Sequence, residues 1–191
     1  MTNTENTARN INKRIVQVEE KKGLTISDLI LVAVLLAAGA VLKYFVGSII
    51  NIGGMKPNFI IAMYCLAILL IKPKVHEAAI IGLLAGAICQ LFPGTPYINL
   101  LSELVGATAM GLLIKCPMQI KNFSLIPIVA TFVSTVLSGG LFTVCLFLFT
   151  NADSSAMVAY VPIVFFTAVF NAVIVQALYV PLKAALKRGN K

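Results

Sequence analysis

The side chains best suited to chemistry form a small polar set at or near the ends of long apolar segments: Lys56, Asn58, Gln90, Asn99, Ser102, Glu103 and, deeper in its segment, Asn171. Glu103 is the most informative of them, because a carboxylate inside an apolar segment is costly unless it is paired or faces water. Two interpretations stay open. Glu103 is either an interfacial acid paired with Lys43 or Lys56, or a carboxylate that binds a ligand.

A second set of candidate residues is apolar or aromatic: Met55, Phe59, Met63, Tyr97, Phe142, Phe166 and Phe170. With the polar set, these side chains are suited to line a pocket for a flat apolar group, since ligand pockets are mostly apolar with a few convergent polar groups. Taken singly, each also has the plainer role of packing in a helix bundle or facing lipid. We expect Ser134, Thr135 and Ser138 to bond back to carbonyls of their own helix.

Motifs of the common catalytic and metal sites are missing from the sequence. It contains neither a G-x-x-x-x-G-K-[ST] phosphate loop nor an H-E-x-x-H zinc motif. The single histidine, His76, stands beside Glu77 at the start of an apolar segment, where a solvated interfacial residue is expected. The four cysteines lie in separate segments without a C-x-x-C pair, as small buried hydrophobes do. We therefore expect no enzyme, no catalytic residue, no metal site and no cofactor bound by this chain.

The elements that must position these residues follow from the composition. The chain has 191 residues, of which 59% are hydrophobic and 12% charged, and its mean hydropathy is +0.95. Soluble domains keep roughly a quarter of their residues charged, so a soluble protein is excluded. The net charge of +8 would suggest nucleic acid for a soluble protein. Here the basic residues lie at the ends of apolar segments, which predicts a lipid bilayer as the surroundings and no nucleic-acid partner.

The apolar residues form six segments that we expect to be transmembrane helices, near residues 27–46, 58–71, 76–92, 97–114, 123–149 and 157–186. The predicted fold class is thus an all-α integral membrane bundle, with a polar cytoplasmic N-terminal segment (1–24), a six-helix transmembrane domain (25–187) and a basic cytoplasmic tail (188–191). Thr25 with Asp28 predicts a capping box at the first helix. Gly82 and Gly86 form a G-x-x-x-G, which predicts a close helix approach.

The distribution of Lys and Arg predicts the orientation of these six helices. Thirteen of the fifteen basic residues fall on one side of the membrane, and only Lys43 and Lys56 fall on the other. Because cytoplasmic loops carry the excess of Lys and Arg, both termini are expected in the cytoplasm and the loops after the first, third and fifth helices outside. The expected location is the bacterial plasma membrane.

The first apolar segment contains Ala33-Val34-Leu35-Leu36-Ala37, an A-x-x-x-A pattern of small residues on one helix face. With six short helices in about 190 residues and no ATPase motif, the chain resembles the substrate-binding S components of energy-coupling factor (ECF) transporters. In that family this motif packs against a membrane-embedded coupling subunit. The resemblance therefore implies an interface with that partner at Ala33 and Ala37.

Within this family, the stretch Gly54-Met55-Lys56-Pro57-Asn58 resembles the tryptophan-transporter branch, with Asn58 in the place of an acid. Asn99 and Asn171 also resemble that branch, whereas Ser102-Glu103 stands where an Asp-Lys pair is expected. The likeness extends from Leu29 to Leu186. It implies a subunit that binds tryptophan in the membrane and works with a transmembrane coupling subunit and two ATPase subunits, which use the ATP.

A zwitterionic aromatic amino acid needs a cationic site, an anionic or acceptor site and a flat apolar slot. Lys56 and the start of the following helix suit the carboxylate. Glu103 and Asn99 suit the ammonium, the Phe and Met set suits the ring, and Asn171 or a serine suits the indole N–H. Alternatives are a vitamin or another aromatic compound on the same scaffold, an intramembrane enzyme, or a membrane protein outside the ECF class that binds no ligand.

Overall fold

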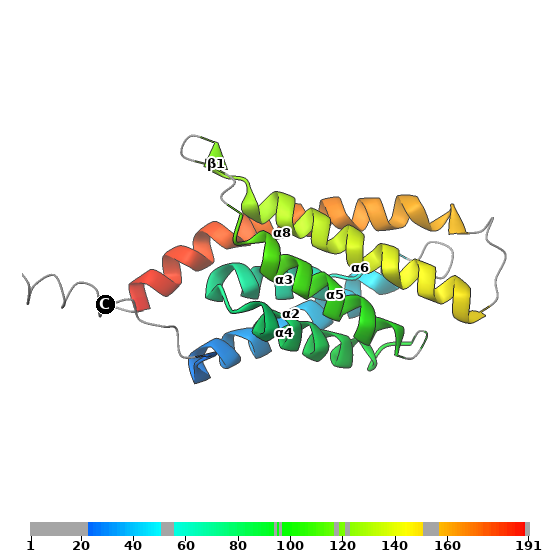
Figure 1. Ribbon diagram of the computed structural model, residues 1–191, viewed down its shortest axis with the longest axis horizontal. Coiled ribbons are helices and arrows are strands. Elements are labelled where there is room, and N and C mark those ends of the chain that lie inside the picture. The colour runs from blue at the N-terminus through cyan, green and yellow to red at the C-terminus, as the bar shows by residue number, and fades with distance from the viewer. Residues whose placement is uncertain are drawn as a thin grey trace, which may run out of the picture.

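Six helices make up almost all of the described part of the chain in the computed structural model, which describes residues 23–50, 56–93, 95, 97–116, 119–120, 123–150 and 157–189. They are α2 (Ile26–Ile49), α3 (Ile60–Ile71), α4 (Val75–Cys89), α5 (Ile98–Leu113), α6 (Ile126–Thr150) and α8 (Tyr160–Gly189). Two antiparallel two-residue strands, β1 (Gln119–Ile120) and β2 (Phe123–Ser124), precede α6, with Gln119 opposite Ser124. The helices lie roughly along one axis (Figure 1). The predicted all-α class is confirmed.

Helix starts follow from local hydrogen bonding. The Thr25 hydroxyl accepts a hydrogen bond from the Asp28 N–H (3.2 Å), and the Asp28 carboxylate accepts one from the Thr25 N–H (3.0 Å). This is the predicted capping box at the start of α2. At α4 the Glu77 carboxylate accepts from the Lys74 N–H (2.7 Å), which stabilises the helix start in the same way.

Helix α3 occupies the centre of the bundle and packs against α2, α4, α5, α6 and α8. Ten consecutive residues, Ile60 to Leu69, are buried. With 12 residues it is only about 18 Å long, well short of the roughly 30 Å hydrocarbon core of a bilayer. A central helix that is surrounded by other helices does not contact lipid. Its length therefore need not equal the thickness of the hydrocarbon core.

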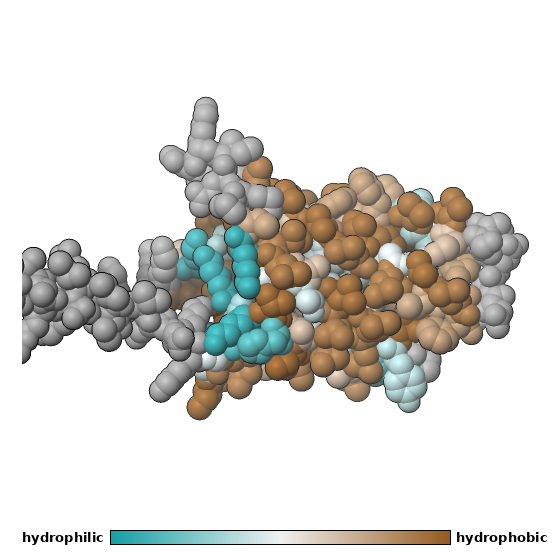
Figure 2. All heavy atoms as spheres, viewed as in Figure 1, coloured by the Kyte–Doolittle hydropathy of each residue, from teal (hydrophilic) through white to brown (hydrophobic). Residues whose placement is uncertain are grey.

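Three helices, α2, α6 and α8, are long and apolar enough to cross a membrane, over Ile26–Gly47, Ile126–Thr150 and Tyr160–Leu186. Helices α3, α4 and α5 are apolar but shorter. Large apolar side chains such as Val34, Leu148 and Val173 are exposed on the outside of the bundle, as expected where lipid replaces water. Figure 2 shows this hydrophobic surface and a hydrophilic cluster at the end where α2 begins and α8 ends.

Glycines bring the helices into close contact. A Cβ on Gly82 would lie 2.5 Å from the Glu103 carbonyl oxygen and 2.6 Å from the Ala107 Cβ. One on Gly86 would lie 2.7 Å from the Leu100 Cα. The close helix approach predicted from the G-x-x-x-G of α4 is confirmed, since only glycine lets α5 approach this closely. It also fixes the turn of α5 that carries Glu103.

Candidate ligand-binding cavity

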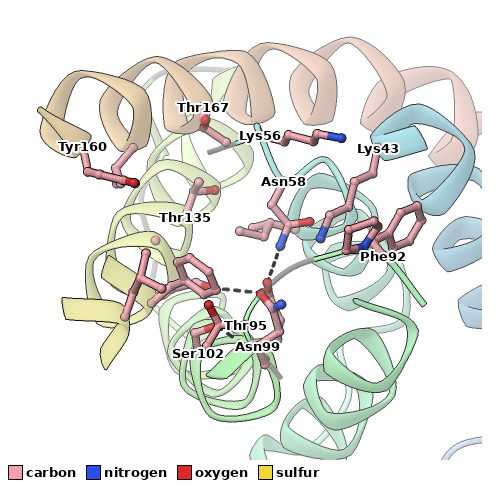
Figure 3. A pocket seen from close by; sticks show the side chains of 18 of the residues that line it. Lys43, Lys56, Asn58, Phe92, Thr95, Asn99, Ser102, Thr135, Tyr160 and Thr167 are labelled. Carbon is pink, nitrogen blue, oxygen red and sulfur yellow. Dashed lines mark hydrogen bonds between the residues drawn. The ribbon is translucent and has the colours of Figure 1, made fainter. Parts of the chain in front are cut away.

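A cavity of about 610 Å³ lies between the helix ends at one end of the bundle, opposite the hydrophilic cluster. Its size is in the range of small-molecule pockets, about 300–1,000 Å³. The C-terminal ends of α2, α4 and α6 and the N-terminal ends of α3, α5 and α8 converge there (Figure 3). Asn58 and Ile61, at the start of the short helix α3, line it.

The buried carboxylate of Glu103 faces this cavity from α5 and is only 1% exposed. One carboxylate oxygen accepts a hydrogen bond from the Asn58 side-chain amide, and the other accepts from the Ser138 hydroxyl of α6 at 3.0 Å. Both donors are neutral. The carboxylate is therefore held in a fixed orientation while each oxygen retains acceptor capacity for a ligand.

Asn58 is in turn positioned by a hydrogen bond from Asn171 of α8. The Asn171 side-chain amide donates to the Asn58 backbone carbonyl (3.1 Å) and to the Thr135 hydroxyl (3.4 Å). Asn171 is fully buried and does not line the cavity. Among the described residues its amide oxygen has no hydrogen-bond partner.

Two lysines supply positive charge to the cavity wall. The half-buried Lys43 of α2 places its ammonium 3.3 Å from the Cys89 sulfur and 5.2 Å from the centre of the Phe92 ring. Lys56 is exposed, and its stem runs beside Gly47: a Cβ on that glycine would lie 3.5 Å from the Lys56 Cβ. The cavity thus offers a carboxylate, two ammonium groups and an apolar wall.

Residues 25–187 match the family model described as the tryptophan transporter TrpP. The chain belongs to this family. It is 27% identical over 168 residues to a probable tryptophan transport protein of Clostridium acetobutylicum, covering 86% of this chain and 96% of the relative. It is 25% identical over 166 residues to a probable tryptophan transport protein of Bacillus subtilis, covering 85% and 94%. No solved structure matches the chain significantly.

Membership of TrpP confirms the resemblance to the tryptophan-transporter branch. Because the members of this family are transporters, membership also supports the expectation that the chain is not an enzyme. With its long apolar helices, the chain is a multi-pass protein of the plasma membrane.

Six residues proposed from the sequence line the cavity of this TrpP-family chain: Lys56, Asn58, Asn99, Ser102, Glu103 and Phe142. Met55 lies outside the described residues. The side chain of Gln90 links the end of α4 to the start of α5, because it donates to the Gly86 carbonyl (3.1 Å) and accepts from the Tyr97 N–H (3.1 Å). Tyr97 is 75% exposed, and neither of these two residues lines the cavity.

The aromatic residues proposed on α8 do not face the cavity. Phe166 and Phe170 are 60% and 55% exposed, on the outer side of the helix. The face turned to the cavity carries Tyr160, Val164 and Thr167 instead, spaced by four and three residues as one helix face requires. Phe59 is buried at the start of α3 and does not line the cavity.

Several cavity residues were not proposed from the sequence as ligand-binding groups: Lys43, Tyr44, Phe92, Ser138, Tyr160, Val164 and Thr167. Thr135 bonds back to the Thr131 carbonyl (2.8 Å), as expected. That expectation was wrong for Ser138, which donates to Glu103, and for Ser134, which donates to the Gly106 carbonyl of α5 (2.7 Å).

Ala33 and Ala37 lie on the outside of α2 and are both exposed. The inner face of this helix carries Val32, Leu36 and Gly39, which are buried against the bundle. The two alanines are therefore not part of the buried packing within the described part of the chain, and their face is available to the surroundings.

Proposed function

We propose that this TrpP-family chain binds tryptophan in the cavity and serves as the membrane-embedded substrate-binding subunit of an ECF-type transporter for tryptophan uptake. One observation carries the proposal: a single cavity of suitable size is lined by a buried carboxylate, by lysines and by aromatic side chains. These are the three kinds of group that a zwitterionic aromatic amino acid needs.

The ammonium of the substrate binds at Glu103. The Glu103 carboxylate accepts hydrogen bonds from the neutral donors Asn58 and Ser138, and a carboxylate has about four acceptor positions, so it can accept a further hydrogen bond. Asn99 and Ser102 line the cavity from the same helix and supply additional polar atoms. A charge-assisted hydrogen bond of this kind is among the stronger ones in proteins.

The carboxylate of the substrate lies on the positive side of the cavity. Lys43 and Lys56 line that side. The first turn of α3 begins there as well, and no side chain caps it, so its N–H groups and the positive end of the helix dipole favour an anion.

The indole ring lies against the apolar part of the wall, which is formed by Ile61, Phe92, Phe142, Leu146, Tyr160 and Val164. Aromatic side chains contact a flat ring over a large area and add edge-to-face interactions. Thr167 also lines the wall, and its hydroxyl oxygen is a candidate acceptor for the indole N–H. Its own hydrogen is donated to the Ile163 carbonyl (2.7 Å).

All six apolar segments carry the chain across the membrane in this proposal, with both termini in the cytoplasm and the cavity open to the outside. Thirteen basic residues against two favour this orientation. It is tested with an impermeant thiol reagent. Cys116 is native and exposed beyond the end of α5, while Cys65, Cys89 and Cys145 are buried. Cys116 should react only after lysis, and Leu91→Cys, beyond the end of α4, should react in intact cells.

The partners in this proposal are a transmembrane coupling subunit, which contacts the exposed face of α2 at Ala33 and Ala37, and two ATPase subunits. ATP is used by those subunits, and this chain binds no cofactor. The exposure of both alanines on the outside of the bundle supports such a contact.

Binding is tested by the fluorescence of the ligand itself, because the chain contains no tryptophan. The added ligand is then the only source of indole fluorescence in the sample. Transfer from water into the cavity should shift its emission to the blue, with a saturable dependence on protein concentration. Emission that stays like that of the free amino acid at high protein concentration would exclude tryptophan. A vitamin or another aromatic compound that shifts the thermal stability would then identify the alternative ligand.

A further inference from the structure

We propose that Lys43 of α2, rather than Lys56, is the residue that binds the substrate carboxylate and determines selectivity for an amino acid over the corresponding amine. The inference rests on the proposed function, since it assigns Lys43 to the carboxylate of a zwitterionic amino acid that is bound in that cavity. Lys43 of α2 and Glu103 of α5 then each hold one end of the substrate within the same cavity.

The position of Lys43 on its helix is the first argument. Val32, Leu36 and Gly39 form the inner face of α2, and Lys43 is the next residue on that face, four positions after Gly39. Gly39 packs so closely on α3 that a Cβ there would lie 2.9 Å from Met63. A lysine on the inner face of a membrane helix is costly unless it pairs or faces a polar cavity, and such residues mark substrate sites.

The contacts of the Lys43 ammonium are the second argument. Among the described residues, it donates to the Cys89 sulfur at 3.3 Å and lies 5.2 Å from the centre of the Phe92 ring. The thiol is a weak acceptor, and the ring attracts the cation through its face. Neither carries the negative charge that would neutralise it. An ammonium has three donors, so capacity remains for an anion in the cavity.

The negative charge in the same cavity is the Glu103 carboxylate, and Lys43 is not among its hydrogen-bond donors. The hydrogen bonds of the Glu103 carboxylate come from Asn58 and Ser138, both neutral. Figure 3 shows Lys43 extending from α2 into the cavity, toward the side chain of Asn58. The charges of Lys43 and Glu103 already attract each other, and an amino-acid zwitterion between them would give each a directly bonded counter-charge, with its carboxylate on Lys43 and its ammonium on Glu103.

The position of Lys56 differs from that of the half-buried Lys43. Lys56 is exposed, its stem runs along Gly47 at the rim, and Figure 3 shows its ammonium apart from the side chain of Asn58. An exposed cation keeps most of its hydration and contributes little to a specific ion pair. Its charge at the rim is suited to attract anions rather than to position one.

The test compares tryptophan with tryptamine, which has the same ring and ammonium but no carboxylate. Both are followed by their indole fluorescence in purified wild-type protein, Lys43→Met and Lys56→Met. The wild type should prefer tryptophan by on the order of tenfold to a hundredfold, the value of a hydrogen bond to a charged group. Lys43→Met should lose this preference, and Lys56→Met should keep it.

Tryptamine also serves as the control for folding. Its affinity for Lys43→Met should equal or exceed the wild-type value, because the substitution removes a repelling charge and leaves the ring site intact. Lys43→Gln, which keeps a polar side chain without the charge, provides a second variant and should lose the preference as well.

The outcomes separate this inference from the proposed function. Lys43 variants that still prefer tryptophan by the wild-type factor would overturn the inference and leave tryptophan binding in place. Loss of the preference in Lys56→Met alone would overturn it in favour of Lys56. Wild-type protein that binds neither compound would overturn the proposed function itself, and the inference with it.

Discussion

At the scale of single residues, the cavity is organised around one buried carboxylate. Glu103 receives hydrogen bonds from a residue before α3 and from a residue on α6. Asn171 on α8 in turn holds the backbone of Asn58. Three other parts of the chain therefore fix the orientation of one side chain, which is how a binding group is kept in place before the ligand arrives.

Replacing Glu103 with glutamine should weaken tryptophan binding by about 1.5–3 kcal/mol, because the substitution keeps the shape of the side chain but removes the charge that attracts the ammonium. Fluorescence titration of the bound indole measures the change. Indole-3-propionate, which lacks the ammonium, is the matched control and should bind the variant no more weakly than the wild type. Equal losses for the two ligands would mean that Glu103 acts on the structure of the cavity and not on the ammonium.

At the scale of helices, the short central helix and the glycine contacts decide where the cavity lies. Helix α3 begins at Ile60, and the longer helices α2, α6 and α8 surround the space at its N-terminal end. Helix α5, which carries Glu103, is set against α4 by Gly82 and Gly86. The position of the carboxylate thus depends on residues that never touch a ligand.

Gly82→Ala should lower both the thermal stability and the tryptophan affinity. Its new Cβ would lie 2.5 Å from the Glu103 carbonyl oxygen, so α4 and α5 must move apart and Glu103 must move with α5. Overpacking of this kind costs about 1–3 kcal/mol. Gly140→Ala is the matched control, since a Cβ there meets no atom within 4 Å. A Gly82→Ala protein as stable as this control would show that the contact is not tight in solution.

At the scale of the whole molecule, the cavity and the exposed face of α2 are separate surfaces of one chain. Glu103 and its partners lie inside the bundle, whereas Ala33 and Ala37 lie on its outside. Ligand binding by the isolated chain and assembly with partner subunits should therefore be separable by substitution.

Ala33→Phe or Ala37→Phe should leave tryptophan binding by the purified chain unchanged and abolish uptake in cells, because a bulky side chain holds a partner helix away from a small-residue face. Val173→Phe, at a position that is 61% exposed on α8, is the control and should retain both activities. If the alanine variants lost binding, the residues would belong to the internal packing of the bundle and the proposed coupling contact would be wrong.

The sequence by itself determined the features that depend on local or summed properties. Long apolar runs are enough to predict membrane helices, and Thr25 with Asp28 is enough to predict a cap, because neither depends on the rest of the fold. Glu103 also stood out in the sequence, since the cost of a carboxylate in an apolar segment follows from its position in the chain alone.

Only the tertiary structure decided which face of each helix turns inward. In a soluble protein, polar residues mark the outer face, but lipid is as apolar as the core, so periodicity gives little sign of direction in a membrane helix. Phe166 and Phe170 look as suitable for a pocket as Tyr160 and Val164, yet only the latter pair lines the cavity. For the same reason the inward position of Lys43 is visible only once α2 is packed against α3.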